Sequence, residues 1–237
     1  MHPHKLTLYL LICLIVVFLS AKMSFPKQPT GGRLAIVVDE RLAALRRAPY
    51  LNSQLVRRLS RGRMVAIRAS RTTPDGVVFY LVNVTSRTQG WIQREAVVSA
   101  RHLGDDRRLL ELINLSQGFD RIVRTRIFLD HFPRSPLRPQ VLLKFGDTAE
   151  DLSAKLSSEA AKRLNGTMAN APEFTYFLNY SGLDRYNRQR VNFIFHAPTK
   201  RLHYDGAAWG ELVRRHPNSP EAPEARKRLA QLAQLKR

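Results

Sequence analysis

Two stretches of the chain align at an offset of 84 residues: Phe132-Pro133-Arg134-Ser135-Pro136-Leu137-Arg138-Pro139-Gln140-Val141 and His216-Pro217-Asn218-Ser219-Pro220-Glu221-Ala222-Pro223-Glu224-Ala225. They share three prolines and one serine at the same places. A residue that precedes proline disfavours the α region, so a helix is expected to end before Pro133 and before Pro217. Ser135 and Ser219 suit the N-cap of the next helix, because a serine oxygen can accept a hydrogen bond from the first turn. The proline that follows each serine suits the first helical position, where a backbone N–H has no partner within the helix. The repeat therefore predicts two helix–turn–helix units.

The helix expected after the second stretch carries small and apolar residues on one face, at spacings of three and four: Ala222, Ala225, Leu229 and Leu232. This second copy, residues 205–235, resembles the tetratricopeptide-like repeats of bacterial envelope proteins. The first copy, residues 119–156, lacks the alanine pattern. Repeats of that family follow one another at about 34 residues. We therefore expect a helical region over residues 104–237 with two separated helical pairs and an insertion at about 165–205.

The insertion has a strand pattern. Residues 191–195 alternate, residues 197–200 contain a turn with proline, and residues 201–204 return, which predicts a β-hairpin. Its aromatic residues either pack the hairpin onto the helices or, together with interleaved arginines, line a ligand surface.

Residues 33–103 predict a small β unit. Short runs of branched and aromatic residues, separated by turns, stand at residues 34–38, 56–59, 64–67, 77–84, 91–92 and 95–98. The turn at Thr73-Pro74-Asp75-Gly76 has a proline that presets φ and a glycine that accepts the left-handed region. Strands at this spacing are typical of a small barrel or sandwich.

The segments that carry a family resemblance are Leu59-Ser60-Arg61-Gly62-Arg63-Met64-Val65, Phe79-Tyr80-Leu81-Val82-Asn83-Val84 and Gly90-Trp91-Ile92. They resemble a bacterial SH3-like domain, with Tyr80 where many members have Trp. The resemblance implies a small β-barrel and a cell-wall peptide ligand. Tyr80 and Trp91 either fill the barrel core or line a shallow peptide groove.

A cluster of arginines lies in the same unit: Arg57, Arg58, Arg61 and Arg63. Residues 33–103 contain 13 Arg, no Lys and four acids, a balance of +9. The cluster is either a solvated face or a contact surface for carboxylates or phosphates, which pair bidentately with the guanidinium fork. With Tyr80 and Trp91, these four arginines are the candidate ligand-binding residues.

The N-terminus has the layout of a secretory signal, because Lys5 precedes the uncharged, largely apolar residues 6–21. Residues 1–21 form either a cleaved signal peptide or a signal anchor in the inner membrane, and residues 22–32 form a Pro/Gly-rich linker. This predicts an extracytoplasmic location, periplasmic or at the cell surface.

The chain of 237 residues has 39 Lys+Arg against 19 Asp+Glu, a net charge of +20, which favours an anionic partner. The single cysteine, Cys13, excludes a disulfide framework and a multi-cysteine metal site. The sequence has no catalytic, metal-binding or cofactor-binding motif.

These observations predict an α+β multidomain chain, with an SH3-like β-barrel followed by a tetratricopeptide-like helical region that contains an inserted β-hairpin. The function expected is that of a non-enzymatic binding or scaffold protein. Its partners would be a cell-wall peptide or another anionic envelope component, a protein held by the helices, and the membrane through the N-terminal segment. Two alternatives stay open, a cell-envelope enzyme with an unrecognised active site and a basic protein that binds nucleic acid. Export would argue against nucleic acid as a partner.

Overall fold

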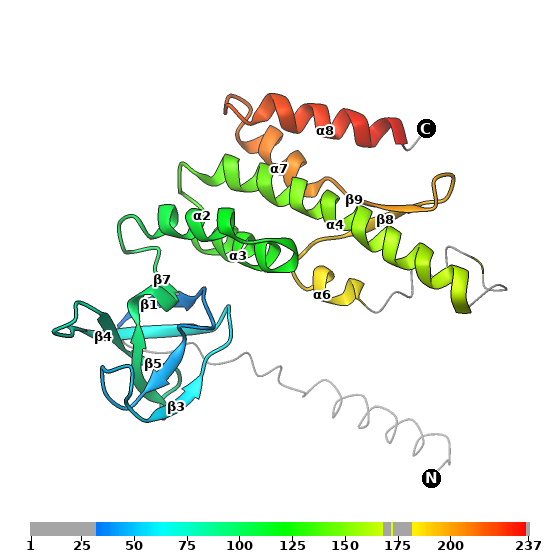
Figure 1. Cartoon of the computed structure of the whole chain (residues 1–237). Coiled ribbons are helices and arrows are strands. Elements are labelled where there is room, and N and C mark those ends of the chain that lie inside the picture. The colour runs from blue at the N-terminus through cyan, green and yellow to red at the C-terminus, as the bar shows by residue number, and fades with distance from the viewer. Residues whose placement is uncertain (1–31, 168–171, 173–181, 236–237) are drawn as a thin grey trace, which may run out of the picture.

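The chain forms a strand-rich first part and a helical second part in the computed structural model, which describes residues 32–167, 172 and 182–235 (Figure 1). The predicted N-terminal signal, residues 1–21, and all of the predicted linker except its last residue lie outside the described residues. None of the helices in the described ranges is long and apolar enough to cross a membrane. The α+β class is confirmed.

The first part is one antiparallel sheet in the order β3-β2-β6-β5-β4-β1-β7. Its strands are β1 (Arg33–Val37), β2 (Ala44–Arg46), β3 (Leu55–Arg58), β4 (Met64–Thr72), β5 (Val78–Asn83), β6 (Gln89–Gln93) and β7 (Val97–Val98), with a 3₁₀ turn η1 (Arg94–Ala96) before β7. The strand β2 is absent from the sequence prediction, because Ala44-Leu45-Arg46 is too short to show a period.

The predicted closed barrel is wrong, because β3 and β7 are the two free edges of an open sheet. At the β7 edge, the guanidinium of Arg108 donates hydrogen bonds to the carbonyl oxygens of Val97 and Glu95. An arginine from the helical part therefore satisfies carbonyls that a neighbouring strand would bond in a barrel. At the other edge, all four residues of β3 are exposed.

The strand β1 has both faces buried. Ala35 and Val37 belong to the core of the sheet, whereas Ile36 and the following Val38 belong to the core of the helical part. Successive side chains of a strand point to opposite faces, so one short strand serves two cores. One face of the sheet therefore packs against the core of the helical part.

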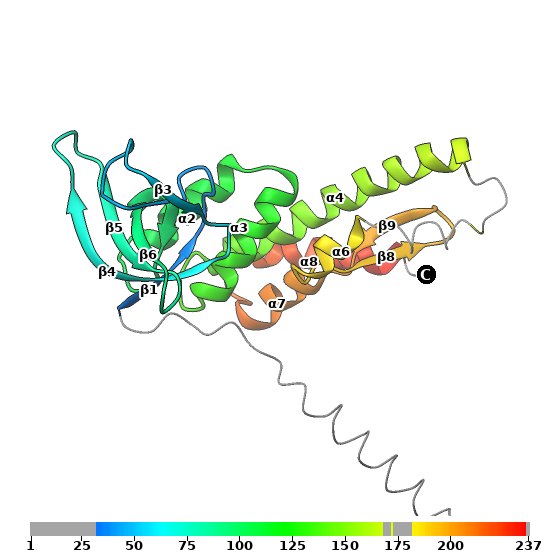
Figure 2. The same ribbon diagram turned by 90° about the horizontal axis from the view of Figure 1, so that it is seen from below.

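The second part contains six helices and a two-stranded sheet among the described residues. They are α2 (Asp105–Leu115), α3 (Gly118–His131), α4 (Arg138–Thr167), α6 (Leu183–Asn187), β8 (Phe193–His196), β9 (Arg201–Tyr204), α7 (Ala207–Arg215) and α8 (Ala222–Leu235). Along the molecule, α3 packs on α4, α4 packs on α7, and α7 packs on α8. Figure 2 shows the sheet at one end and α4 extending away from it.

The turns of the 84-residue repeat have the same backbone hydrogen bonds. The predicted N-cap contact forms only at Ser135, whose Oγ accepts a hydrogen bond of 3.2 Å from the amide of Leu137, whereas Ser219 Oγ is buried without a hydrogen-bond partner among the described residues. The amide of Phe132 bonds to the carbonyl of Phe128, and that of Ser135 to Phe132; at the second turn, His216 bonds to Leu212, and Ser219 to His216. The residues at the two helix ends also match, with φ −121° and ψ 57° at Phe132 and φ −134° and ψ 52° at His216. The predicted repeat is therefore present as two helical pairs, and the second pair packs directly on the first despite the insertion.

The inserted hairpin is confirmed as β8 and β9, and it lies against α4. The amide of Leu202 donates to Ser157 Oγ at 2.8 Å, and that of Tyr204 donates to Glu150 Oε2 at 2.8 Å. The ring of Tyr186 packs edge-on against Phe119 and Phe193, with centroid distances of 5.2 and 5.5 Å. These aromatic residues pack the insertion onto the helices, which is one of the two alternatives left open by the sequence. The aromatic residues 174–180 of the insertion lie outside the described residues.

The contact between α4 and α7 depends on Gly146. A Cβ added to Gly146 would lie 2.2 Å from Nε1 of Trp209 and 2.6 Å from its Cε2. Trp209 is buried and cannot move aside. We expect Gly146→Ala to lower the free energy of unfolding by about 1–3 kcal/mol through overpacking, as measured by urea denaturation.

Gly210, on α7, is the matched control, because a Cβ there meets nothing within 4 Å. Gly210→Ala is expected to raise the free energy of unfolding by up to about 1 kcal/mol through helix propensity. A Gly146→Ala protein as stable as the wild type would contradict the packing described for α4 and α7.

Candidate functional site

The predicted arginine cluster is divided by the structure. Arg57 and Arg58 are exposed on the edge strand β3. Arg61 instead forms an ion pair of 2.8 Å with Asp120 of α3, and its side chain is only 13% exposed. Arg63 is half-buried and directly precedes β4. Arg61 therefore joins the sheet to the helices, and Arg57 and Arg58 remain open to a ligand.

The two predicted aromatic residues lie on opposite faces of the sheet. Tyr80 is buried in the sheet core and pairs across the strands with Ile92, which belongs to the same core. Trp91 precedes Ile92 and therefore points to the other face, where it is half-buried opposite Leu81. One groove lined by both rings is not formed, and Tyr80 has the core role that the sequence left as its alternative.

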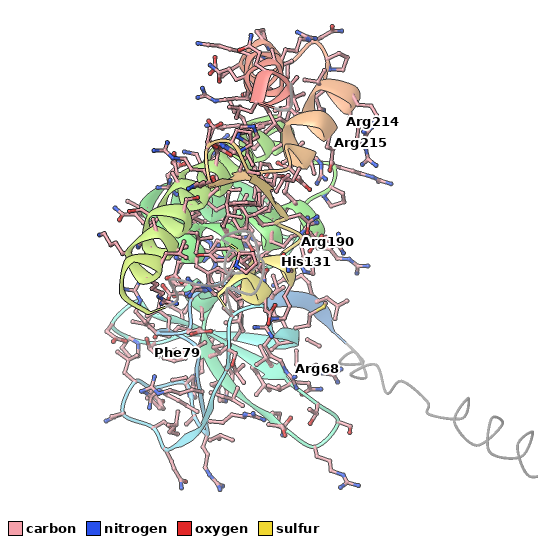
Figure 3. The ribbon with its side chains drawn as sticks, turned by 90° about the vertical axis from the view of Figure 1, so that its right-hand side faces the viewer. Arg68, Phe79, His131, Arg190, Arg214 and Arg215 are labelled. Atoms are coloured by element: carbon pink, nitrogen blue, oxygen red, sulfur yellow. The ribbon has the colours of Figure 1, made fainter. Side chains whose placement is uncertain are left out.

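A different group of arginines gathers in the helical part, around a cavity of about 420 Å³. The cavity is bounded by α3, the start of α4, the end of β9 and α7. Its charged residues are Arg126, Asp130, Arg138, Arg190, Glu211 and Arg215. In Figure 3, Arg190 and Arg215 lie on the same side of the molecule, together with Arg214. We call this group the arginine cavity.

Each carboxylate of the arginine cavity is shared by two guanidinium groups. Asp130 pairs with Arg126 and, at 3.7 Å, with Arg190. Glu211 pairs with Arg138 at 2.6 Å and with Arg215 at 3.7 Å. Arg138 is buried and also donates to the carbonyl of Leu129 at 2.7 Å. Four cations face two anions, so the cavity has an excess of positive charge.

The ionisation of the acidic groups follows from these contacts. Burial raises the pKa of Asp130, but the hydrogen bond and charge of Arg126 outweigh it, so the pKa lies below its usual value of 3.8. Burial likewise raises the pKa of Glu211, and the hydrogen bond and charge of Arg138 lower it below 4.5. Burial raises the pKa of the Tyr204 hydroxyl far above 10, so this group stays neutral. At neutral pH the cavity thus offers cations and hydrogen-bond donors to an anion.

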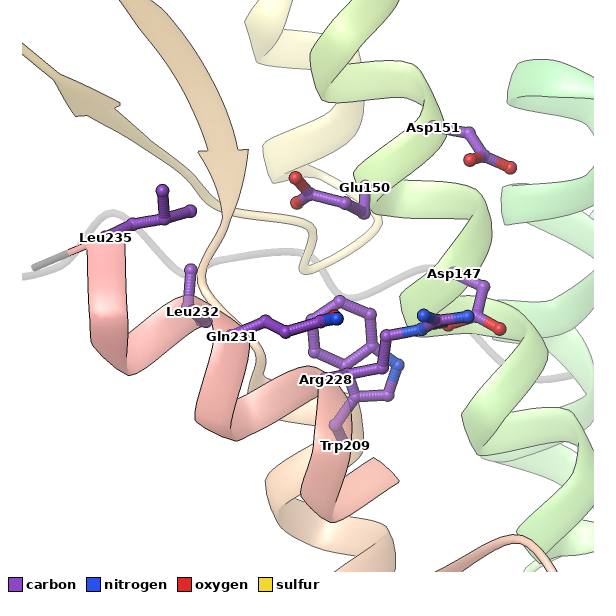
Figure 4. Close-up of a pocket in the computed structure, with 8 residues that line it drawn as sticks. All are labelled: Asp147, Glu150, Asp151, Trp209, Arg228, Gln231, Leu232 and Leu235. Atoms are coloured by element: carbon purple, nitrogen blue, oxygen red, sulfur yellow. Dashed lines mark hydrogen bonds and ion pairs between the residues drawn. The ribbon is translucent and has the colours of Figure 1, made fainter. Parts of the chain in front are cut away.

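A second, smaller cavity of about 250 Å³ lies between α4 and α8 (Figure 4). Asp147 there pairs with Arg228 at 3.2 Å, and Glu150 accepts a hydrogen bond from the amide of Tyr204 and lies 2.8 Å from Nδ1 of His203. These side chains hold the hairpin and α8 against α4. Within the described ranges, no group of three or more His, Cys, Asp or Glu side chains could hold a metal ion.

The sequence interpretation missed the arginine cavity. Arg126 and Asp130, like Glu211 and Arg215, are four residues apart on a helix, a spacing that indicates a neighbouring ion pair. Nothing in the sequence indicates that these two pairs meet, or that Arg138 and Arg190 join them. That meeting depends on the packing of α7 against α4.

Comparison of the chain with protein-family models, curated proteins and solved structures finds no match.

The lowered pKa values of Asp130 and Glu211 predict an acid-sensitive contact. A group with a depressed folded-state pKa stabilises the fold above its unfolded pKa, and this contribution is lost as the pH falls through the folded value. The loss should begin near pH 4.5–3.8, the ordinary values of the two groups, and continue below. Urea denaturation over this range should show a smaller loss of stability in the Asp130→Asn/Glu211→Gln protein. Asp75→Asn, in an exposed turn, is the control, and an unchanged pH slope in the double variant would contradict this ionic arrangement.

Proposed function

We propose that this protein is a non-enzymatic binding or scaffold protein of the bacterial envelope, held by or exported through residues 6–21. In this proposal the sheet is an SH3-like unit that contacts an anionic envelope component. The helices are a tetratricopeptide-like unit that holds an acidic segment of a protein or cell-wall peptide. The observation that carries the proposal is the arginine cavity, where four guanidinium groups surround two carboxylates.

The chemistry of the arginine cavity favours carboxylate ligands. A guanidinium presents five donors in a planar fork that matches a carboxylate or phosphate bidentately. Arg190 and Arg215 are exposed and stand at 3.7 Å from the internal carboxylates, so they have donors available for a ligand. Arg126 and Arg138 make the shorter ion pairs and position Asp130 and Glu211. Arg190 and Arg215 are therefore the proposed ligand contacts.

The repeat explains how the arginine cavity arises. Arg126 and Asp130 come from the first helical pair, whereas Glu211 and Arg215 come from α7 of the second pair. The hairpin between the pairs supplies Tyr204, whose hydroxyl accepts a hydrogen bond of 2.8 Å from the amide of Ala208. A ligand bound by Arg190 and Arg215 would bridge the insertion and the second helical pair.

The ligand proposal is tested with isolated peptidoglycan and with the stem peptides released from it, which carry free carboxylates. We expect the full chain to bind both. Arg190→Ala/Arg215→Ala should weaken binding tenfold or more, since a hydrogen bond to a charged group contributes about 1.5–3 kcal/mol. Titration followed by fluorescence anisotropy of a labelled stem peptide gives the affinities.

Arg214→Ala is the matched control, because Arg214 is exposed next to Arg215 on α7 and does not line the arginine cavity. It should change the affinity less than twofold. Equal losses in both variants, or no binding by the wild type, would reject the cavity as the site. Tighter and steeply salt-dependent binding to duplex DNA would instead support the nucleic-acid alternative.

The location is tested separately. A fusion of residues 1–32 to a reporter enzyme that is active only outside the cytoplasm should give activity, and replacement of Leu11 and Leu14 by Arg in the apolar stretch should abolish it. A reporter fusion that stays inactive would reject the envelope location.

A further inference from the structure

The strand β3 is an uncovered end of the sheet. It is hydrogen-bonded to β2 on one side only, and all four of its residues are exposed. In Figure 1 it lies at the bottom of the sheet, away from the helices. An edge strand carries a row of backbone N–H and C=O groups without strand partners, which is a template for a further strand.

Apolar side chains concentrate on this strand and on the loop that leads into it. Four large hydrophobic side chains there are between 42% and 51% exposed: Tyr50, Leu51, Leu55 and Val56. They are half of the eight large hydrophobic residues exposed in the described part of the chain, and all four lie within seven residues. The loop before β3 is fixed, because Arg46 Nη1 donates to the carbonyl of Ser53 at 2.7 Å and the amide of Ala48 donates to Ser53 Oγ at 2.9 Å. The surface is therefore formed before any partner arrives.

The charged residues at this edge are all arginines and therefore all positive. Arg47, Arg57 and Arg58 are exposed beside the four apolar residues. No Asp or Glu occurs between residues 41 and 74. The nearest acid before this range, Glu40, already accepts a hydrogen bond of 2.7 Å from the amide of Arg61. An occupant of the edge must consequently bring the negative charge.

We propose that β3 binds an acidic, extended segment of another protein as an eighth strand of the sheet. Main-chain hydrogen bonds to β3 would supply affinity, and the alternating side chains of the segment would supply specificity. On one face of the sheet the segment would contact Leu55 and Arg57, and on the other face Val56 and Arg58, so it needs apolar and acidic residues in adjacent pairs. A second copy of this chain is disfavoured at the same edge, because pairing β3 with β3 would bring two sets of arginines together. This surface lies on the sheet, so the proposal goes beyond the function proposed for the arginine cavity and does not depend on it.

The test uses the full chain in detergent micelles and a labelled peptide with paired residues, acetyl-Glu-Glu-Val-Val-Glu-Glu-Val-amide, which places carboxylates on both faces of an added strand, as the probe. We expect binding, together with at least tenfold slower hydrogen exchange of those β3 amides that face away from β2. Arg57→Glu/Arg58→Glu should weaken binding at least tenfold. The matched control Arg226→Glu/Lys227→Glu changes the charge equally on α8, where both residues are exposed, and should leave the affinity within twofold.

A peptide series tests the strand geometry without changing the protein. N-methylation of alternate peptide amides should abolish binding for one set of positions and spare the other, because only every second amide of an added strand faces β3. Equal binding of both peptide sets would overturn the proposal, as would self-association of the chain through β3. Loss of binding in Arg190→Ala/Arg215→Ala would place the peptide in the arginine cavity and would also overturn it. The result of the stem-peptide experiment on the arginine cavity does not affect these outcomes. Each proposal can therefore be rejected without rejecting the other.

Discussion

The alternation of side chains along β1 is the constraint on which the arrangement of this molecule depends. Val37 points into the sheet core, while Ile36 and Val38 point into the helical core. A single strand cannot shift by one residue without exchanging these two sets, so its register fixes the sheet and the helices together. The strand β7 repeats the device, because Val97 belongs to the first core and Val98 to the second. The two parts of the chain are therefore joined by a shared wall.

Arginines also hold this junction together, so part of the large positive charge of the chain makes internal contacts. Arg124 is buried, donates to the carbonyl of Val38 at 3.2 Å and to Ser116 Oγ at 2.6 Å, and lies 3.9 Å from Asp39. Arg108 bonds to the edge of β7, and Arg61 pairs with Asp120. A guanidinium can satisfy several backbone carbonyls and carboxylates at once, so it suits a junction with many open acceptors. Part of the +20 charge thus serves the interior, while Arg57 and Arg58 on β3 and Arg190 and Arg215 at the arginine cavity remain exposed.

The two proposed contact surfaces lie in different parts of the molecule. The edge of β3 is a property of the sheet alone, whereas the arginine cavity requires both helical pairs and the hairpin between them. The close approach of α7 to α4 at Gly146 brings Glu211 and Arg215 to the cavity. Under the two proposals, the protein would hold two acidic partners at once, one as an added strand and one between helices.

The sequence by itself determined most elements of this fold. The Pro-x-Ser-Pro repeat located the turns at Ser135 and Ser219, and the alternation over residues 191–195 with the turn at 197–200 located the hairpin, because proline geometry and side-chain periodicity act within a few residues. The tertiary structure alone decided that the sheet is open, that Arg61 is paired, and that Arg126, Arg138, Arg190 and Arg215 meet in one cavity. These outcomes depend on contacts between residues far apart in the chain, such as Arg138 with Glu211 and Arg108 with Val97. Local propensity carries no information about such contacts, because they exist only after the helices and the sheet have packed together.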